Sequence, residues 1–194
     1  ALHYQKALSI EPNNQEVQYI LAAINNKKPP KRAPEEYLQN LFDQYANHYD
    51  QHLVDVLKYN VPDVLLKMFE THYPDKLNLQ VLDLGCGTGL GGEQFREISK
   101  HLTGVDISAK MLDQARKKNL YDKLIQADIH KILHDQENID LIIATDVFSY
   151  SGDLSCLIQQ CHNSLCEGGI LAFSVESLPN QSQNYVLQPS VRYA

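Results

Sequence analysis

The chain has 194 residues, with 43% hydrophobic and 21% charged residues, a formal net charge of −7 and a pI near 5.5. This size and composition allow one well-buried domain plus a small appendage, and the acidic balance disfavours a nucleic-acid partner, which would need a basic face. No apolar stretch approaches the roughly 20 residues that span a bilayer, and no charged-then-apolar signal opens the chain. We therefore predict a cytoplasmic protein without a membrane partner.

The first 26 residues carry a helical pattern. Tyr4, Ala7 and Pro12 lie in YQKALSIEP, and a second amphipathic stretch follows at residues 17–24. This spacing resembles the second helix of a tetratricopeptide repeat that runs into the first helix of the next repeat. Because such repeats pack against their neighbours, the resemblance implies further repeats before Ala1 and a protein partner bound through them. A simple helical hairpin is the alternative.

Residues 27–34 read KKPPKRAP, in which prolines fix the backbone and four cations favour contact with water. We predict a solvated linker over residues 27–36, with a binding role for the basic cluster as the alternative. Between residues 35 and 69, apolar residues recur at three- and four-residue intervals, which predicts amphipathic helices. Pro62 is placed to open the last of them.

From residue 79 onward, short apolar runs alternate with helical patterns. We predict strands at residues 80–84, 101–105, 123–127, 141–144 and 169–175, and helices near residues 91–98, 109–118 and 154–165. Alternation of this kind gives an α/β fold, in which helices cover both faces of a parallel sheet.

The stretch VLDLGCGTG at residues 81–89 is a buried strand that turns sharply on alternating glycines. Such a turn lets the backbone approach a nucleotide-type cofactor. Asp83 places a carboxylate where a dinucleotide would place its pyrophosphate, and two anions in one poorly solvated turn repel each other. S-adenosylmethionine (SAM) carries an ammonium and a sulfonium but no phosphate. We therefore predict SAM as the cofactor, with S-adenosylhomocysteine (SAH) as its product.

Acidic residues also follow the next three predicted strands, at Asp106, Asp128 and Asp146. In an open parallel sheet the ligand lies outside the carboxyl ends of the strands. Asp106 is placed to accept both ribose hydroxyls of the cofactor, and Asp128 with Ile129 is placed at the adenine. Taken singly, these carboxylates have structural alternatives as caps and turn formers.

The motifs VLDLGCGTG, LTGVDISAKMLDQA, QADI, DLIIATDVFSY and LCEGGILAFS together resemble class I SAM-dependent methyltransferases, in order and spacing, over about 100 residues. The resemblance implies a Rossmann-like SAM-binding domain at residues 79–178 with strand order 3-2-1-4-5. It implies that Asp83 and the Gly85 backbone hold the methionine end. It assigns the rest of the cofactor site to Cys86, Gly87, Gly89, Asp106 (ribose), Ile107 and Met111 (adenine faces), Asp128 and Ile129 (adenine edge), and Thr145.

The segment FDQYANHYD is similar to the lid of small-molecule methyltransferases such as the biotin-pathway and ubiquinone-pathway enzymes. The resemblance implies a helical lid at residues 37–78 whose Tyr49 approaches the cofactor. YSGDL at residues 150–154 and QPSVRY at residues 188–193 resemble a group of predicted tetratricopeptide-repeat-containing methyltransferases.

A nicotinamide cofactor is the main competitor, because residues 87–92 also satisfy GxGxxG with Asp106 near the expected acid position. The match lies two residues later than a dinucleotide-binding strand would place it, behind Asp83 and Gly85. A NAD-dependent oxidoreductase is therefore the weaker alternative.

Methyl transfer from a sulfonium releases a neutral leaving group, so the protein need only desolvate, align and sometimes deprotonate the acceptor. If a catalytic side chain exists, Asp146, Tyr150 and Tyr45 are the candidates. TDVF at residues 145–148 departs from [DN]PP[YF], which disfavours exocyclic amines as acceptors. Small-molecule oxygen, carbon and carboxylate acceptors remain.

The cysteines and histidines predict no metal site. Cys156, Cys161 and Cys166 recur every fifth residue, which on a helix places neighbours about 140° apart, so we expect free buried thiols. The pairs His130 and His134, and His48 and His52, are expected to be solvated, because neither occurs in an HExxH motif.

The family's sheet has seven strands, yet only about 18 residues follow Glu176, too few for a helix and two strands. We therefore expect a sequence cut at both ends, with a truncated tail at residues 179–194. A SAM- or SAH-binding interaction module, coupled to partner proteins through its repeats, is the alternative to an enzyme.

Overall fold

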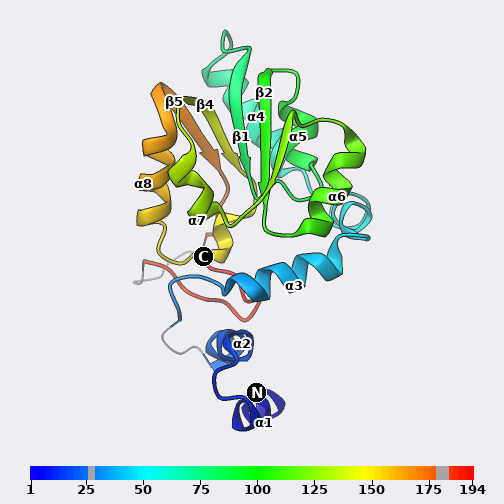
Figure 1. Cartoon of the computed structure of the whole chain (residues 1–194), viewed down its shortest axis with the longest axis vertical. Coiled ribbons are helices and arrows are strands. Elements are labelled where there is room, and N and C mark those ends of the chain that lie inside the picture. Colours follow the sequence, from blue (N-terminus) through cyan, green and yellow to red (C-terminus); the bar gives the residue numbers. More distant parts are fainter. Residues whose placement is uncertain (26–28, 178–183) are drawn as a thin grey trace.

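A five-stranded parallel sheet forms the centre of the molecule (Figure 1). The computed structural model describes residues 1–25, 29–177 and 184–194; Lys27 and Lys28 of the predicted linker, and the start of the predicted tail, lie outside the described residues. The strands are β1 (Leu79–Leu84), β2 (Ser99–Asp106), β3 (Lys123–Gln126), β4 (Ile139–Ala144) and β5 (Leu165–Phe173). Their order, β3-β2-β1-β4-β5, confirms the predicted α/β fold.

Helices cover both faces of this sheet. They are α4 (Val61–His72), α5 (Leu90–Phe95), α6 (Ala109–Lys118), α7 (Ile129–Ile132), the short η2 (Leu133–Asp135) and η3 (Phe148–Tyr150), and α8 (Ser155–Ser164). Alternate residues of each strand point to opposite faces. In β1, Leu82 and Leu84 pack in the cluster that includes Leu157 of α8, whereas Val81 packs in the cluster with Phe69 of α4 and Phe95 of α5.

Two predicted features of the last strand-helix unit are wrong. β5 begins at Leu165, four residues before the predicted start at Gly169, and its pairing with β4 shifts register between Ile139 and Leu141. Cys166 therefore lies on a strand rather than on the helix of Cys156 and Cys161. The four cysteines are free, as expected, but only Cys86 and Cys161 are buried.

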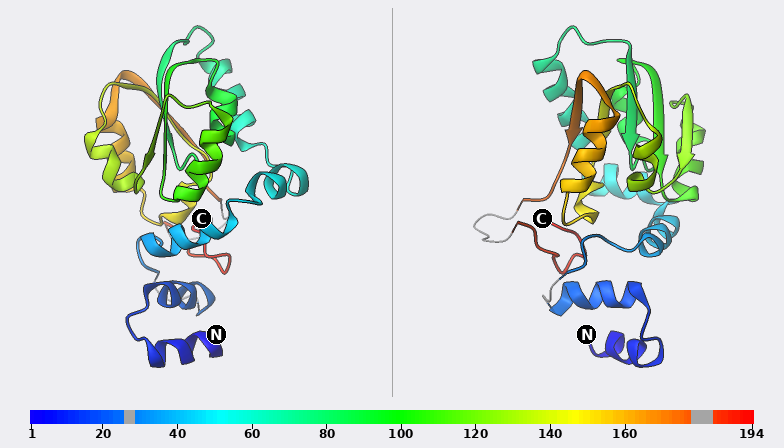
Figure 2. Two further views of the ribbon diagram at one scale, coloured as in Figure 1. Left: turned by 45° about the vertical axis from the view of Figure 1, so that its right-hand side comes forward. Right: turned by 60° about the vertical axis from the view of Figure 1, so that its left-hand side comes forward.

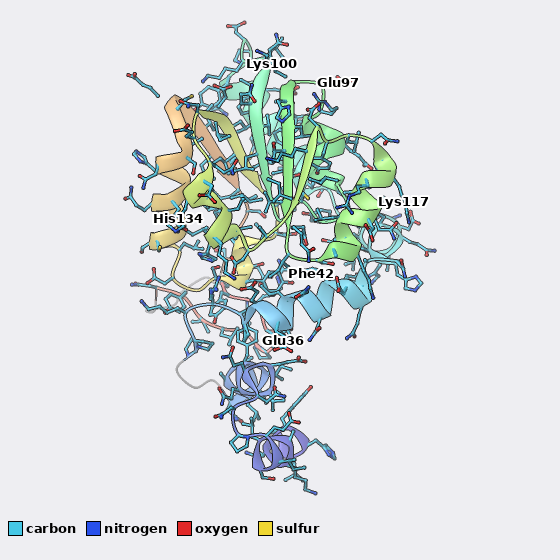
Figure 3. All side chains as sticks on the ribbon, viewed as in Figure 1. Glu36, Phe42, Glu97, Lys100, Lys117 and His134 are labelled. Atoms are coloured by element: carbon cyan, nitrogen blue, oxygen red, sulfur yellow. The ribbon has the colours of Figure 1, made fainter. Side chains whose placement is uncertain are left out.

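The N-terminal third lies beyond the carboxyl ends of the strands (Figures 1 and 2). It contains α1 (Leu2–Ile10), α2 (Gln15–Asn25), α3 (Glu35–Tyr45) and the π-helix η1 (Gln51–Val56). Helix α3 crosses under the strand ends, and Figure 3 places its Phe42 at the end of the sheet opposite to Lys100. None of the helices in the described parts of the chain combines the length and the apolarity needed to cross a membrane.

The C-terminal segment, residues 184–194, joins the N-terminal helices to the sheet domain. Its Tyr193 is buried in a cluster that includes Tyr19 of α2 and Tyr37 of α3. The Tyr19 hydroxyl donates to the Val191 carbonyl oxygen at 2.7 Å, and the Tyr193 hydroxyl donates to the Pro30 carbonyl oxygen at 2.6 Å. The segment is thereby held between α2 and the residues that precede α3.

We expect Tyr193→Phe to lower the free energy of unfolding by about 1 kcal/mol, because the buried Tyr193 side chain loses its hydrogen bond to Pro30. Tyr185→Phe is the matched control, since the Tyr185 ring packs 5.9 Å from that of Tyr193 but its hydroxyl donates to none of the described residues. Urea unfolding of both variants measures the difference. Equal stability of the two variants would show that the Tyr193 hydroxyl does not hold the two segments together.

Candidate functional site

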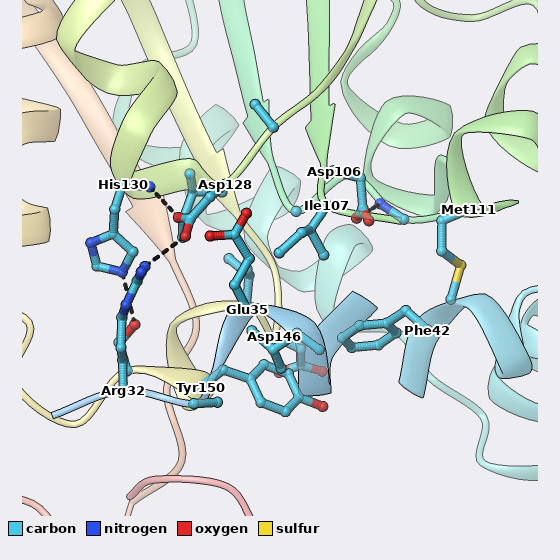
Figure 4. Close-up of a pocket in the computed structure, with 18 of the residues that line it drawn as sticks. Arg32, Glu35, Phe42, Asp106, Ile107, Met111, Asp128, His130, Asp146 and Tyr150 are labelled. Atoms are coloured by element: carbon cyan, nitrogen blue, oxygen red, sulfur yellow. Dashed lines mark hydrogen bonds and ion pairs between the residues drawn. The ribbon is translucent and has the colours of Figure 1, made fainter. Parts of the chain in front are cut away.

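A pocket of about 740 Å³, partly open to solvent, lies between the carboxyl ends of the strands and α3 (Figure 4). Its walls come from the segment before α3, from α3 itself and from the ends of four strands. The lining residues are Arg32, Ala33, Glu35, Leu38, Phe42, Tyr49, Gly85, Gly87, Asp106, Ile107, Met111, Ala127, Asp128, Ile129, His130, Thr145, Asp146, Val147, Tyr150 and Ser151.

The glycine turn after β1 forms one wall of this pocket. Gly85 and Gly87 have φ values of +66° and +54°, which side chains disfavour. A Cβ on Gly85 would lie 2.5 Å from Cγ2 of Val147, whereas a Cβ on Gly87 would meet no atom within 4 Å. Gly87 therefore leaves open space at the pocket wall, where a ligand can approach the backbone.

Asp106 at the end of β2 fixes this turn. Its Oδ2 accepts from the Gly87 backbone N–H at 2.9 Å, and its Oδ1 accepts from the Ser108 backbone N–H at 2.8 Å. Burial raises the pKa of Asp106 to about 6, although these backbone hydrogen bonds oppose the shift. The carboxylate lines the pocket directly beside the open face of Gly87.

Asp83 lies beneath the residues that line the pocket. It is fully buried, its Oδ2 accepts from the Tyr121 hydroxyl at 2.7 Å, and its Oδ1 has no partner among the described residues. Burial raises the pKa of Asp83 to about 7; the Tyr121 hydroxyl opposes the shift, and the charge of Asp106 adds to it. A cation near this position would favour the ionised form.

This pKa predicts a pH dependence of stability. Between the ordinary value of 3.8 and about 7, the folded state keeps a proton on Asp83 that the unfolded chain has lost. The free energy of unfolding therefore falls as the pH rises through this window, by at most about 4 kcal/mol, and then levels off. Urea unfolding at pH 5 and pH 8 should show a smaller difference in Asp83→Asn than in the native chain. The difference should persist in Asp75→Asn, which alters an exposed residue; an unchanged difference in Asp83→Asn would contradict the account.

The part of the pocket next to α7 contains Asp128, which follows β3. Its Oδ1 caps α7 by accepting from the His130 backbone N–H at 2.8 Å, and its Oδ2 accepts from Arg32 Nη1 at 2.7 Å. His130 is half-buried against this ion pair, and its Nε2 lies 3.3 Å from Ser151 Oγ. The expectation of a solvated His130 is thus wrong, because the ring is partly buried and lies beside Ser151. Burial lowers its pKa.

Asp146, at the end of β4, has a φ of +58° and holds the opposite side of the pocket. Its Oδ1 accepts from Ser174 Oγ at 3.0 Å and lies 3.6 Å from Arg192 Nη2. Arg192 comes from the C-terminal segment, also pairs with Glu176 Oε1 at 2.6 Å, and lies over the ring of Tyr150. The C-terminal segment therefore contributes a cation beneath this part of the site.

Aromatic rings close the side of the pocket that faces α3. Phe42 lies 5.6 Å from Tyr150 and 6.5 Å from Tyr49 between ring centroids. Burial raises the pKa values of Tyr49 and Tyr59, and the charge of Asp146 adds to both shifts. These rings cover the strand ends and limit the access of water to them.

Most of the residues that the sequence predicts for the site lie together in the pocket lining. Tyr49, Gly85, Gly87, Asp106, Ile107, Met111, Asp128, Ile129, Thr145, Asp146 and Tyr150 line it. The other four predicted residues do not. Asp83 and Cys86 are buried beneath the turn, Gly89 is the N-cap of α5, and the Tyr45 hydroxyl pairs with His52.

Sequence reasoning missed Arg32, Phe42, Tyr59 and Arg192. Phe42 could have been found, because it opens the FDQYANHYD segment. Arg32 and Arg192 belong to segments without a motif that points to the cofactor, and only the fold brings them to the strand ends.

Comparison with known proteins places this arrangement in a family. Residues 82–173 match a family model described as a methyltransferase domain. The malonyl-[acyl-carrier protein] O-methyltransferase of Enterobacter lignolyticus is 32% identical over 145 residues, which cover 73% of this chain and 55% of that protein. The chain thus spans about half the length of the curated relatives that it matches.

Solved structures share the fold. A SAM-dependent methyltransferase from Clostridium acetobutylicum has a TM-score of 0.54 and 26% identity, over 66% of this chain and 56% of that chain. The magnesium protoporphyrin IX methyltransferase of Synechocystis, solved with bound SAH, has a TM-score of 0.58 at 16% identity, over 68% of each chain, and shows the likeness of fold alone. Residues 82–173 therefore match a methyltransferase domain in sequence, and the parallel sheet of this chain is shared by a SAM-dependent methyltransferase of known structure.

Proposed function

We propose that the chain binds SAM in this pocket and transfers its methyl group to a small-molecule acceptor. The observation that carries the proposal is the open face of Gly87 beside Asp106. There the backbone leaves room for a ligand, and a buried carboxylate lies at its edge. SAH- and SAM-bound structures among the neighbours with the same fold support SAM as the cofactor.

The residues present fit this cofactor. Asp83 Oδ1 is a buried carboxylate oxygen without a described partner, below the methionine end of the proposed site. Asp106 provides acceptors for ribose hydroxyls, and Ile107 and Met111 provide apolar contacts for the adenine. A pyrophosphate at the same turn would face two buried carboxylates, whose repulsion disfavours a dinucleotide.

When bound, SAM supplies a methyl group that a nucleophile can attack on carbon, with the electron pair of the broken C–S bond going to sulfur. The chain aligns the acceptor and excludes water, which are the main requirements of this reaction. A carboxylate acceptor needs no proton removal. For a hydroxyl or carbon acceptor, we propose that Asp146 takes the proton, because it lines the pocket beside Tyr150. We give Tyr45 a lesser part, since its hydroxyl pairs with His52.

We propose a carboxylate as the first acceptor to test, because the similar curated proteins are malonyl-[acyl-carrier protein] O-methyltransferases. A malonyl thioester and methyl-labelled SAM would be incubated with the native chain and with Asp106→Ala. The expected product is a labelled methyl ester, formed by the native chain and strongly reduced in the variant. If label instead appears on other small molecules when a metabolite extract replaces the thioester, the acceptor belongs to another chemical class.

A non-catalytic interaction module is the second candidate. Helix α1 contains no buried residue and exposes Leu2 and Ile10, at 64% and 80%. An exposed apolar face of this kind supports a helical hairpin of the tetratricopeptide type, which binds a protein partner or a further repeat. The module is favoured over the enzyme if SAH binds tightly and no label leaves SAM with either the thioester or the extract.

A further inference from the structure

Arg32 reaches the pocket from outside the methyltransferase domain. It lies in the predicted linker, yet residues 31–33 pair with the segment after β4. Arg32 and Ser151 form an antiparallel bridge. The Ala33 backbone N–H donates to the Tyr150 carbonyl oxygen at 2.9 Å, and the Gly152 backbone N–H donates to the Lys31 carbonyl oxygen at 2.8 Å. This stretch is therefore part of the pocket wall and not a solvated spacer.

The guanidinium of Arg32 points at the residue proposed to hold the adenine edge. Figure 4 shows Arg32 and His130 on one side of Asp128, with the Arg32 Nη1 to Asp128 Oδ2 contact at 2.7 Å. The Asp128 side chain is 5% exposed and that of Arg32 is 41% exposed. Four of the five N–H groups of Arg32 donate to no described residue, so they face the pocket or solvent.

The Asp128 carboxylate accepts hydrogen bonds and the neighbouring Arg32 guanidinium donates them. This pair matches the hydrogen-bonding groups along an adenine edge. The exocyclic amino group of adenine is a donor, and the ring nitrogens N1 and N7 on either side of it are acceptors. If Asp128 accepts from the amino group, a donor beside Asp128 faces one of these nitrogens. Arginine suits this role because its planar fork presents several N–H groups at once.

We propose that Arg32 is a base-recognition residue, which donates to a ring nitrogen next to the amino group that Asp128 binds. The proposal rests on SAM or SAH binding in this pocket. It gives the segment before α3 a direct part in cofactor recognition. A purely structural role, in which Arg32 only holds the segment to Asp128, is the alternative that the test separates.

The test compares SAH with its 1-deaza and 7-deaza analogues, each of which lacks one ring nitrogen, by calorimetric titration. In the native chain, one analogue should bind at least about fivefold more weakly than SAH, as expected for the loss of one hydrogen bond. In Arg32→Met, the same analogue should bind within about twofold of SAH. Arg116→Met is the matched control, since Arg116 also pairs with a carboxylate, that of Asp113 at 2.5 Å, but lies outside the pocket lining.

Arg32→Lys provides a second test in case Arg32→Met does not fold. It keeps a cation beside Asp128 but lacks the planar guanidinium group. It should retain most of the affinity for SAH and lose most of the discrimination against the analogue. If both Arg32 variants keep the native penalty for each analogue, the proposal is wrong and the role is structural. If the native chain does not bind SAH at all, the proposed function itself fails.

Discussion

Gly87→Val is expected to weaken SAH binding by more than about 100-fold, roughly 3 kcal/mol, while the chain still folds. The backbone there has a φ of +54°, and a side chain would enter the open part of the pocket where we place the cofactor. The conformational strain costs about 1–3 kcal/mol of stability. Calorimetric titration with SAH and urea unfolding measure the two effects.

Gly168→Val separates strain from obstruction. Gly168 also has a positive φ, +73°, and a Cβ on it would likewise meet no atom within 4 Å, but it lies within β5, away from the pocket. Its replacement should cost a similar amount of stability and leave SAH binding unchanged. Equal loss of binding in both variants would mean that the glycine turn acts only through folding.

Asp106→Ala is expected to weaken SAH binding by about 1.5–3 kcal/mol, roughly 10- to 150-fold. The substitution removes the carboxylate proposed to accept the ribose hydroxyls. It also leaves the Gly87 and Ser108 backbone N–H groups without their present acceptor. Titration of the folded variant with SAH gives the measured loss.

Asp113→Ala is the control for this variant. Asp113 lies on α6 and its ion pair with Arg116 is exposed, with the two side chains 63% and 55% accessible. Its removal should change SAH affinity by less than about twofold, as expected for an exposed pair. An unchanged dissociation constant in folded Asp106→Ala would contradict the ribose assignment.

The sheet and the glycine turn could be predicted because their signals are local. The apolar runs at β1 and β4 alternate with helical patterns, and the positive φ of Gly85 and Gly87 has a direct sequence counterpart in glycine. The acidic residues after β2, β3 and β4 could be placed at one edge because parallel strands end together. These inferences need no knowledge of distant contacts.

The remaining parts of the site depend on contacts between segments far apart in the sequence. Arg32 meets Asp128 across 96 residues, and Tyr19 meets the carbonyl of Val191 across 172 residues. No local pattern encodes such pairs. The sequence of residues 27–34 by itself therefore predicts a spacer. The position of Asp83 beneath the pocket lining could not be predicted either. The sequence places Asp83 in the buried strand but does not show that its side chain accepts from Tyr121.

Calorimetric titration of the native chain with SAM, SAH and NAD tests the central claim most directly. The acidic strand ends around the open glycine turn predict saturable binding of one SAM or SAH per chain and no heat from NAD. Tight binding of NAD, with no response to either adenosyl compound, would contradict the account.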